Sequence, residues 1–264
     1  MPENQFFMQK FFSISLLCLA LCSPLAAQLN ESDTLLLQYG TSLAGSLQSG
    51  NLDAAALRLK ADFSLAPSPV WAVKTQNSYR YQEFFGRKAD NDFYSRNFLY
   101  LWQRRRAYPF AMAFISTNFR RKIDFRYFAG AGATWQVVRR PGHTLKTALS
   151  GVYESTHFAA SGFNYPEYNG SENIETWRAT FWLFGKHALA GKHLRCYYEV
   201  FAQPSLERGN NFRWQAEVGL EGPVWKGLSF TANYIFAHEN VVVSTVKADD
   251  SLLTFGVAYN GKVR

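Results

Sequence analysis

The sequence is poor in cysteine, and only one of its cysteines is expected in the mature chain. Cys18 and Cys22 lie in an N-terminal apolar stretch, which leaves Cys196 alone. A single thiol excludes an intramolecular disulfide framework and a metal site built from several cysteines. The chain also lacks an HExxH sequence, a phosphate-binding loop and the glycine pattern of dinucleotide-binding folds. We therefore predict neither a metal nor a cofactor.

Long hydrophobic runs are absent beyond the N-terminus. A membrane helix needs about 20 apolar residues, and no stretch after residue 27 reaches that length. The N-terminus itself has Lys10, an apolar run from Phe11 to Cys22, and small residues ending at Ala27. This order is typical of a secretory signal peptide. The run is too short for a membrane anchor, and Leu21 precedes Cys22 where a lipoprotein has a small residue. We predict a cleaved signal over 1–27 and one domain over 28–264.

The charge distribution points away from nucleic acid. The formal net charge is +8 and the pI is about 9.4, but the basic residues are scattered and no nucleic-acid-binding motif occurs. Aromatic residues, by contrast, are abundant: 23 Phe, 14 Tyr and 7 Trp, with a mean hydropathy of only −0.20. Membrane β-barrels combine these two properties, because their strands are half apolar and their aromatics collect at the interfaces. A carbohydrate-binding sandwich would combine them as well.

Apolar and polar residues alternate along the whole mature chain. In Asn211–Gly222, the apolar row includes Trp214, Val218 and Leu220, and the opposite row carries Arg213 and the glutamates. Side chains alternate across a strand, so this period of two predicts β-structure. Segment 92–104 is less regular, since Arg96 shares a row with Phe98 and Tyr100. We predict about 12 strands, near residues 35–48, 51–65, 70–84, 92–104, 109–120, 124–138, 143–157, 172–187, 193–206, 211–222, 228–239 and 250–262.

The links between these strands alternate in length. Links after even-numbered strands are tight: APSP, RRAYP, RRPG, ALAGK and GPVWKG. Links after odd-numbered strands include GRKADND, AASGFNYPEYNGS, SLERGN and NVVVSTVKAD, although QSGN and RRKI are short. A membrane barrel with both termini in the periplasm has short turns there and longer loops outside. The fold class expected is therefore all-β: an antiparallel transmembrane β-barrel whose apolar rows face lipid.

This facing assigns the charged residues to the barrel lumen. The predicted lumen charge network consists of Arg58, Lys60, Asp62, Lys74, Arg80, Asp124, Arg126, Lys146, Glu154, Arg178, Lys186, Arg195, Glu199, Arg213, Glu217 and Glu221. Bases outnumber acids in this network, so an open lumen would favour anions. Pairing of these acids and bases would instead close the lumen, which is the form we expect. An aromatic girdle at headgroup depth is predicted from Trp71, Trp102, Trp135, Trp214 and Trp225.

Three stretches resemble a known family. They are GSLQSGNLDAAALRLKADFSLAPSPVWAVKTQNSYRY, NFRRKIDFRYFAGAGATWQVV and TLKTALSGVYESTHF. The marks are Ser49-Gly50-Asn51, the run from Arg120 to Asp124 before Gly130-Ala131-Gly132, and Tyr153-Glu154. They are similar to the uncharacterised family 481 of domains of unknown function, whose members include proteins described as salt-induced outer-membrane proteins. The resemblance implies an outer-membrane barrel and supplies no catalytic residues.

Polar residues at the barrel rim and aromatic residues in the loops are the candidates for catalysis and ligand binding. A rim-site lipid hydrolase would need a Ser–His pair, for which Ser155, Ser161, His157 and His238, with Glu239 and Asn240, are the candidates. The same residues also suit an ordinary polar rim. Loop aromatics Phe163, Tyr165 and Tyr168 suit either a sugar platform or a cap on the barrel mouth.

The favoured interpretation is a non-enzymatic outer-membrane barrel, without catalytic residues, that has a structural or permeability role. Its partners would be outer-membrane lipid and small solutes. The hydrolase and a soluble exported ligand-binding β-protein are the alternatives.

Overall fold

The computed structural model describes residues 29–49, 53–190 and 193–263, and the predicted signal peptide lies outside these described residues. Within them, no helix has the length and apolar character needed to cross a membrane. The strands are β1 Leu37–Gln48, β2 Ala54–Leu65, β3 Trp71–Phe84, β4 Arg87–Leu101, β5 Ala107–Asn118, β6 Ile123–Arg140, β7 His143–Phe158, β8 Asn173–Leu189, β9 Leu194–Pro204, β10 Phe212–Trp225, β11 Leu228–Glu239 and β12 Asp249–Val263.

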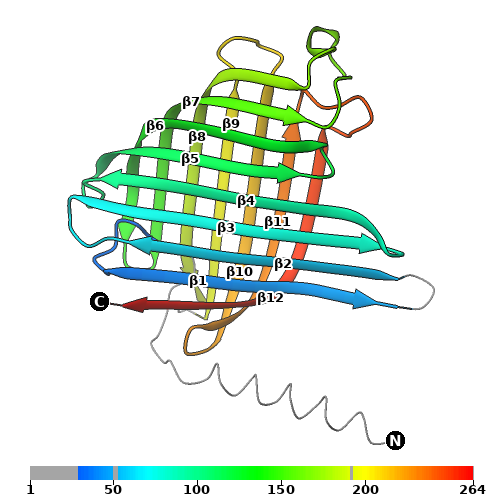
Figure 1. Ribbon diagram of the computed structural model, residues 1–264. Coiled ribbons are helices and arrows are strands. Elements are labelled where there is room, and N and C mark those ends of the chain that lie inside the picture. The colour runs from blue at the N-terminus through cyan, green and yellow to red at the C-terminus, as the bar shows by residue number, and fades with distance from the viewer. Residues whose placement is uncertain (1–28, 50–52, 191–192, 264) are drawn as a thin grey trace, which may run out of the picture.

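The strands form one closed antiparallel barrel, in which every strand pairs with its neighbours along the chain. Strands β1 and β12 close it, with a register that runs from Leu37 opposite Val263 to Leu43 opposite Val257. In Figure 1, β2–β7 cross the front of the barrel at a steep angle to β9–β12 behind them. The predicted architecture of about 12 antiparallel strands is confirmed, and a two-sheet sandwich is not what the chain forms.

The outer surface of the barrel is apolar and its interior is polar. On β10, Val218 and Leu220 are 44% and 43% exposed, whereas Glu221 in the opposite row is 1% exposed. Exposed side chains of the same kind follow the other strands: Leu59, Phe63, Val73, Leu99, Ile115, Tyr127, Leu149, Phe181, Phe230 and Phe255. Exposure of so continuous an apolar surface to water would be unfavourable, whereas the hydrocarbon core of a bilayer is compatible with it. The predicted outward facing of the apolar row in Asn211–Gly222 is confirmed.

Strands β4 and β5 depart from this rule, because they turn aromatic residues inward. Phe98 and Tyr100 on β4 and Phe110 on β5 are buried inside the barrel. They pack with Tyr108, Met112, Phe128 and Val152, and Trp182 of β8 contacts the same cluster. The mixed row noted around Arg96 is therefore an inward row, and its aromatics fill the lumen instead of facing lipid. This interior aromatic cluster was not predicted.

Close approach of β6 to β7 depends on small residues. A Cβ atom on Gly130 would lie 2.1 Å from the carbonyl oxygen of Gly151, and one on Gly132 would lie 2.2 Å from that of Leu149. Since no real Cβ tolerates such distances to backbone, only glycine fits these two inward positions. The repeated glycines of FAGAGATW thus let two strands approach each other tightly on the lumen side.

Several predicted links are shorter in the structure than expected, two of them markedly. The stretch GRKADND was expected to be a loop, but β3 and β4 are joined by Phe85 and Gly86, which have φ of 49° and 69°, and β4 begins at Arg87. The stretch GPVWKG was expected to be a turn, yet β10 continues to Trp225 through a register shift after Pro223. The long loops 159–172, 205–211 and 240–248 do lie together at one end, opposite to the start of β1 and the end of β12.

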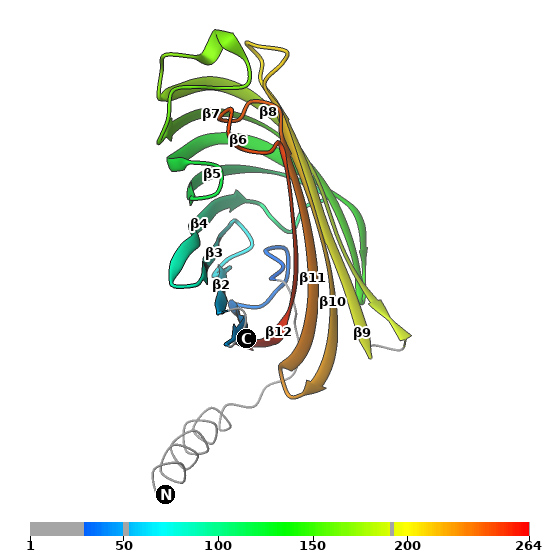
Figure 2. The ribbon, with the colours of Figure 1, turned by 90° about the vertical axis from the view of Figure 1, so that its right-hand side faces the viewer.

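Two of these long loops form a cap. The loop before β8 contains a short 3-10 helix, η1 Pro166–Tyr168, and its Phe163 bridges to Val243 of the loop before β12. Both Phe163 and Tyr168 are 4% exposed, and they pack with Ile123, Phe158, Ile174 and Val241. Buried rings cannot stack on a sugar, so for Phe163 and Tyr168 the structure supports the cap. Tyr165 is half-buried and packs against the same cluster. Figure 2 shows the two loops at the upper end of the barrel.

Candidate functional site: the barrel lumen

The lumen contains a chamber of about 340 Å³. It extends from Asn118 and Asp250, at the long-loop ends of β5 and β12, to Glu221 and Asn260 in the short-turn halves of β10 and β12. Its size falls in the range of small-molecule sites. One part of its wall is aromatic, with Tyr94, Phe114, Phe128, Trp182 and Phe201, and the remainder is polar and charged.

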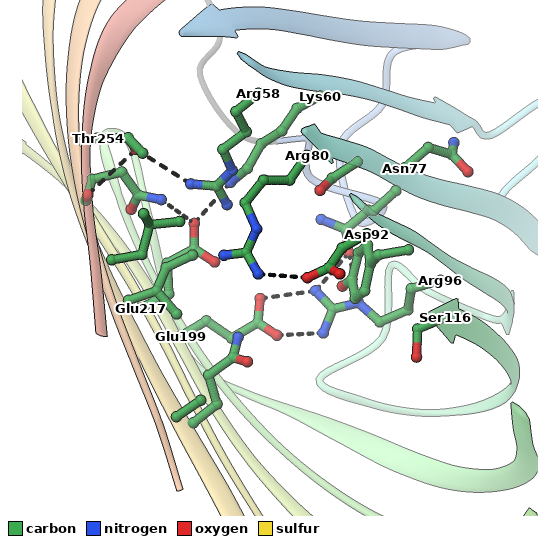
Figure 3. A pocket seen from close by; sticks show the side chains of 18 of the residues that line it. Arg58, Lys60, Asn77, Arg80, Asp92, Arg96, Ser116, Glu199, Glu217 and Thr254 are labelled. Carbon is green, nitrogen blue, oxygen red and sulfur yellow. Dashed lines mark hydrogen bonds and ion pairs between the residues drawn. The ribbon is translucent and has the colours of Figure 1, made fainter. Parts of the chain in front are cut away.

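Ion pairs cross this chamber between strands that are not neighbours. Lys60 of β2 lies 2.8 Å from Glu217 of β10. The Arg96 guanidinium of β4 donates to both carboxylate oxygens of Glu199 on β9, at 2.5 and 3.0 Å. Figure 3 shows both pairs, with the side chains of opposite walls meeting in the interior. A bidentate arginine–carboxylate pair is the strong form of this interaction, so these contacts narrow the lumen between its walls.

A second group of charges lies at the long-loop end of β3 and β4. The Arg80 guanidinium contacts Asp90 at 2.7 Å and Asp92 at 2.5 Å. Arg120 in the β5–β6 turn contacts Asp90 at 2.9 Å and Asp250 of β12 at 3.2 Å. These pairs explain why the polar stretch before Phe93 is strand: its inward carboxylates have arginines opposite them.

A third group, the arginine cluster, comprises Arg121, Arg126, Arg178 and Arg213 around Glu154 and Glu239. Arg178 Nε donates to Glu154 Oε2 at 3.1 Å, and Arg213 Nη2 donates to the same oxygen. Arg126 pairs with both oxygens of Glu239, at 2.9 and 3.0 Å, and lies 3.8 Å from Glu154. All six side chains are at most 14% exposed. Four buried bases therefore share two acids.

A segment of the chain that precedes β1 occupies the short-turn end of the lumen. Residues 29–36, here called the N-terminal segment, turn into the barrel before β1 begins (Figure 2). The Glu31 carboxylate accepts from Lys146 at 2.7 Å and from the Tyr108 hydroxyl at 2.7 Å, and lies 3.7 Å from Lys74. Lys146 also donates to Ser32 and Asn30, and the Gln38 side-chain amide donates to the Asn30 carbonyl. The segment thus adds a side-chain network to the aromatic cluster beside it.

The electrostatic environment of Glu31 favours its charged form. Burial alone would raise the pKa of this carboxyl, but the charges of Lys146 and Lys74 and the hydrogen bonds from Lys146 and Tyr108 lower it from 4.5 to about 2. Glu31 is therefore ionised at neutral pH and neutralises part of the charge of two buried lysines.

Most of the charged residues expected in the lumen line the chamber or its two ends. Besides the pairs above, Arg195 donates to Glu221 at 2.6 Å, and Arg58 donates to Thr254 at 3.3 Å. Asp62 lines the chamber with Lys60, and Lys186 lies on the inward row of β8 near Glu221. Asp124 was expected here, but its side chain is exposed. The register shifts between Ile123 and Phe125, and this irregularity takes Asp124 out of the inward row.

Several lumen residues were missed by reasoning from sequence. Arg96 was set aside because its row was aromatic, whereas that row faces inward. Glu31 precedes the first strand, so no alternation marked it. Asp90 and Asp92 were placed in a loop, and Glu239 was treated as a rim residue although it pairs with Arg126. Charge balance could have revealed the missing acids, because an excess of predicted inward bases requires further acids nearby.

The tryptophans expected in one girdle lie at both ends of the barrel. Trp71, Trp102, Trp135 and Trp225 are exposed in the short-turn half. Trp214 lies at the opposite end of β10, where it contacts Phe236 and faces His238 across the strands. Two belts, one at each interface, are the usual arrangement in membrane barrels.

The rim histidines and Ser155 are not assembled into a catalytic group. His157 on β7 contacts Asn173 at 2.8 Å, while His238 on β11 contacts Asp249 at 2.7 Å and Asn240 at 2.8 Å. Three strands separate β7 from β11 in the barrel, so Ser155 and His157 lie on a different part of the wall from His238. Within the described ranges, no group of three or more His, Cys, Asp or Glu is placed to hold a metal ion.

An apolar outer surface, a charged interior and a closed ladder of antiparallel strands define the outer-membrane β-barrel class. The chain belongs to the family described as "Protein of unknown function, DUF481", whose family model matches residues 41–260. The resemblance noted in the sequence is thereby confirmed. Among curated protein sequences, none matches the chain.

Several solved barrels are similar in fold. The translocator domain of the autotransporter NalP from Neisseria meningitidis is 11% identical, with 97% of this chain and 95% of that one covered and a TM-score of 0.45. The NanC porin is 9% identical, with coverages of 84% and 98% and a TM-score of 0.49. The outer-membrane channel DcaP of Acinetobacter baumannii is 9% identical, with coverages of 86% and 95% and a TM-score of 0.38. At these identities the likeness concerns the fold alone.

Proposed function

We propose that this protein is an integral outer-membrane barrel of a Gram-negative cell with a structural or permeability role, and that its lumen is closed in the resting state. Export by a cleaved signal peptide brings it to that membrane, and lipid contacts its apolar outer surface. It carries out no chemistry. Small solutes occupy the chamber.

The ion pairs across the lumen support the proposal that the lumen is closed. Lys60–Glu217 and Arg96–Glu199 join opposite walls at hydrogen-bonding distance. Below them, the N-terminal segment and the aromatic cluster occupy the short-turn end. Separating buried, paired charges costs several kcal/mol, so the pairs resist opening. The chamber is therefore expected to end blindly at the short-turn side.

The charges that line the chamber give it only weak selectivity between anions and cations. The chamber is lined by seven bases (Arg58, Lys60, Arg80, Arg96, Arg121, Arg126 and Arg213) and by seven acids (Asp62, Asp92, Glu199, Glu217, Glu221, Glu239 and Asp250). Their equal number opposes the anion preference expected from sequence for an open lumen. A preference for anions is retained in the proposal because the arginine cluster concentrates positive charge at one place.

Two experiments test this function. Cell fractionation followed by unboiled and boiled detergent gels should place the protein in the outer membrane and show heat-modifiable migration, because folded membrane barrels resist detergent. Efflux of a small entrapped solute from vesicles containing the folded protein should match that of empty vesicles. A soluble fraction without heat-modifiable migration would refute the membrane barrel, and rapid efflux would refute the closed lumen.

A further inference from the structure

The arginine cluster carries more positive charge than its own acids can balance. Arg121, Arg126, Arg178 and Arg213 face only Glu154 and Glu239, and no side chain of the six is more than 14% exposed. Charges removed from water are tolerated only when they are compensated. The cluster as it stands has an excess of two positive charges in a poorly hydrated place.

Two nitrogens of the cluster have no hydrogen-bond partner. They are Nη1 of Arg213 and Nη1 of Arg121, both buried. The other nitrogens of Arg213 donate to Gln203 and Glu154, and Nη2 of Arg121 donates to the carbonyls of Ala237 and Ala248. Nη1 of Arg121 lies 3.9 Å from Glu239 Oε2, too far for a hydrogen bond. Since buried donors are normally satisfied, the two nitrogens point to a further acceptor. Both arginines line the chamber.

An aromatic wall adjoins the same arginines. The Arg213 guanidinium lies 5.4 Å from the ring centroid of Phe128, which stacks on Phe114 at 4.2 Å. Trp182 and Phe201 continue this wall, and the Trp182 indole nitrogen is also buried without a partner. The lining next to the cluster therefore presents flat apolar surface.

We propose that the chamber binds a small organic anion, a carboxylate attached to a ring, with the carboxylate at Arg213 and Arg121 and the ring against Phe114, Phe128 and Trp182. The charge excess and the free donors select the carboxylate, and the aromatic wall selects the ring. A chamber of about 340 Å³ admits a molecule of this class. The inference rests on the proposed barrel function and specifies which solute occupies it.

Calorimetric titration of the folded, detergent-solubilised protein with sodium benzoate tests the site. Benzoate should bind saturably, and benzamide, which has the same shape without the charge, should bind at least about tenfold more weakly, as expected for loss of a charge-assisted hydrogen bond. Inorganic phosphate should also bind more weakly than benzoate, since it lacks the ring. Absence of saturable benzoate binding, or equal binding of benzoate and either comparison compound, would overturn the proposal.

Variants locate the site. Arg213→Gln should weaken benzoate binding by about tenfold or more, while Glu154 keeps Arg178 and Arg126 as partners. Arg121→Gln offers a second route if the first variant does not fold, because Glu239 keeps its bidentate pair with Arg126. Arg105→Gln, at an exposed position in the β4–β5 turn, removes the same charge outside the lumen and should leave binding unchanged. Unchanged binding in a folded Arg213→Gln or Arg121→Gln protein would refute the placement.

The readouts separate this proposal from the proposed function. Binding is measured on protein that shows heat-modifiable migration, so its failure concerns the anion site alone. Rapid solute efflux from vesicles would refute the closed lumen without bearing on the affinity for benzoate.

Discussion

Single side chains on β10 show most directly how the barrel distinguishes lipid from lumen. Val218 is 44% exposed on the outer surface near the middle of the strand, whereas Gln215 lines the chamber. An arginine on the lipid-facing side near the bilayer midplane costs about 2–4 kcal/mol, and one in a polar lumen costs far less. The same substitution should therefore have different effects at these two positions.

We expect Val218→Arg to reduce the yield of folded barrel in lipid vesicles strongly, and Gln215→Arg to reduce it little. The measurement is the fraction of protein that shows heat-modifiable migration after folding into vesicles of fixed composition. Equal yields for the two variants would contradict the facing assigned to β10.

Glu31 provides a prediction about pH. Its pKa is lowered to about 2 by Lys146 and Lys74, so its ionised form favours docking of the N-terminal segment. This contribution is fully present above pH 4.5, the ordinary pKa, and is lost as the pH falls toward 2. Arg139 also faces the segment and donates to the Ser32 carbonyl, and the Tyr108 hydroxyl donates to Glu31. The segment should be protected above pH 4.5 and released near pH 2, as seen by proteolysis with an acid-active protease.

Glu31→Gln should release the segment at neutral pH. The substitution leaves Lys74 and Lys146 without their carboxylate, and breaking a buried pair in this way costs about 3–5 kcal/mol. Cleavage of the segment by a protease at pH 7 should increase, whereas Glu207→Gln, at an exposed acid of the β9–β10 loop, should change nothing. Equal protection of the Glu31→Gln variant and the unaltered protein would show that the ion pairs do not hold the segment.

At the scale of elements, β6 and β7 depend on their glycines in unequal ways. A Cβ on Gly130 would meet the backbone of β7 at 2.1 Å, while a Cβ on Gly151 of β7 would have nothing within 4 Å. Overpacking of this kind typically costs about 1–3 kcal/mol. Gly130→Ala should lower the denaturant midpoint for unfolding in detergent micelles, and Gly151→Ala should leave it nearly unchanged. Similar midpoints for both variants would argue against the close approach of the two strands.

The strands themselves were predictable because alternation is a local property of the chain. The expected limits 143–157 and 228–239 agree closely with β7 and β11. The turn at Phe85–Gly86 was not predicted, since the polar residues that follow it resemble a loop until Asp90 and Asp92 are seen to pair with Arg80. Such pairings join segments far apart in the sequence, and a single sequence does not reveal them.

The candidate site was predictable only in its composition. Alternation assigned Arg126, Arg178 and Arg213 to the inward rows, but their concentration around Glu154 follows from the barrel register. The inward aromatics Phe98 and Tyr100 were unexpected because sequence rules place aromatics toward lipid. An interior that must be filled as well as neutralised accounts for both features.

At the scale of the whole molecule, the chain combines an apolar outer surface with a lumen that is bridged by ion pairs and filled at one end. The chamber that remains is lined by charge and by aromatic rings, and it extends from the long-loop end into the short-turn half. A barrel of this construction separates binding of a solute from its passage. Passage requires that the N-terminal segment and the cross-lumen pairs move.

Planar-bilayer recording from purified protein, verified as folded by its heat-modifiable migration, tests the closed lumen most directly. The account predicts no stable conductance steps at pH 7 from the unaltered protein, and anion-leaning steps only when Glu31→Gln is combined with Glu199→Gln and Glu217→Gln, which remove the cross-lumen ion pairs. Large, stable, cation-selective steps from the unaltered protein at pH 7 would contradict it.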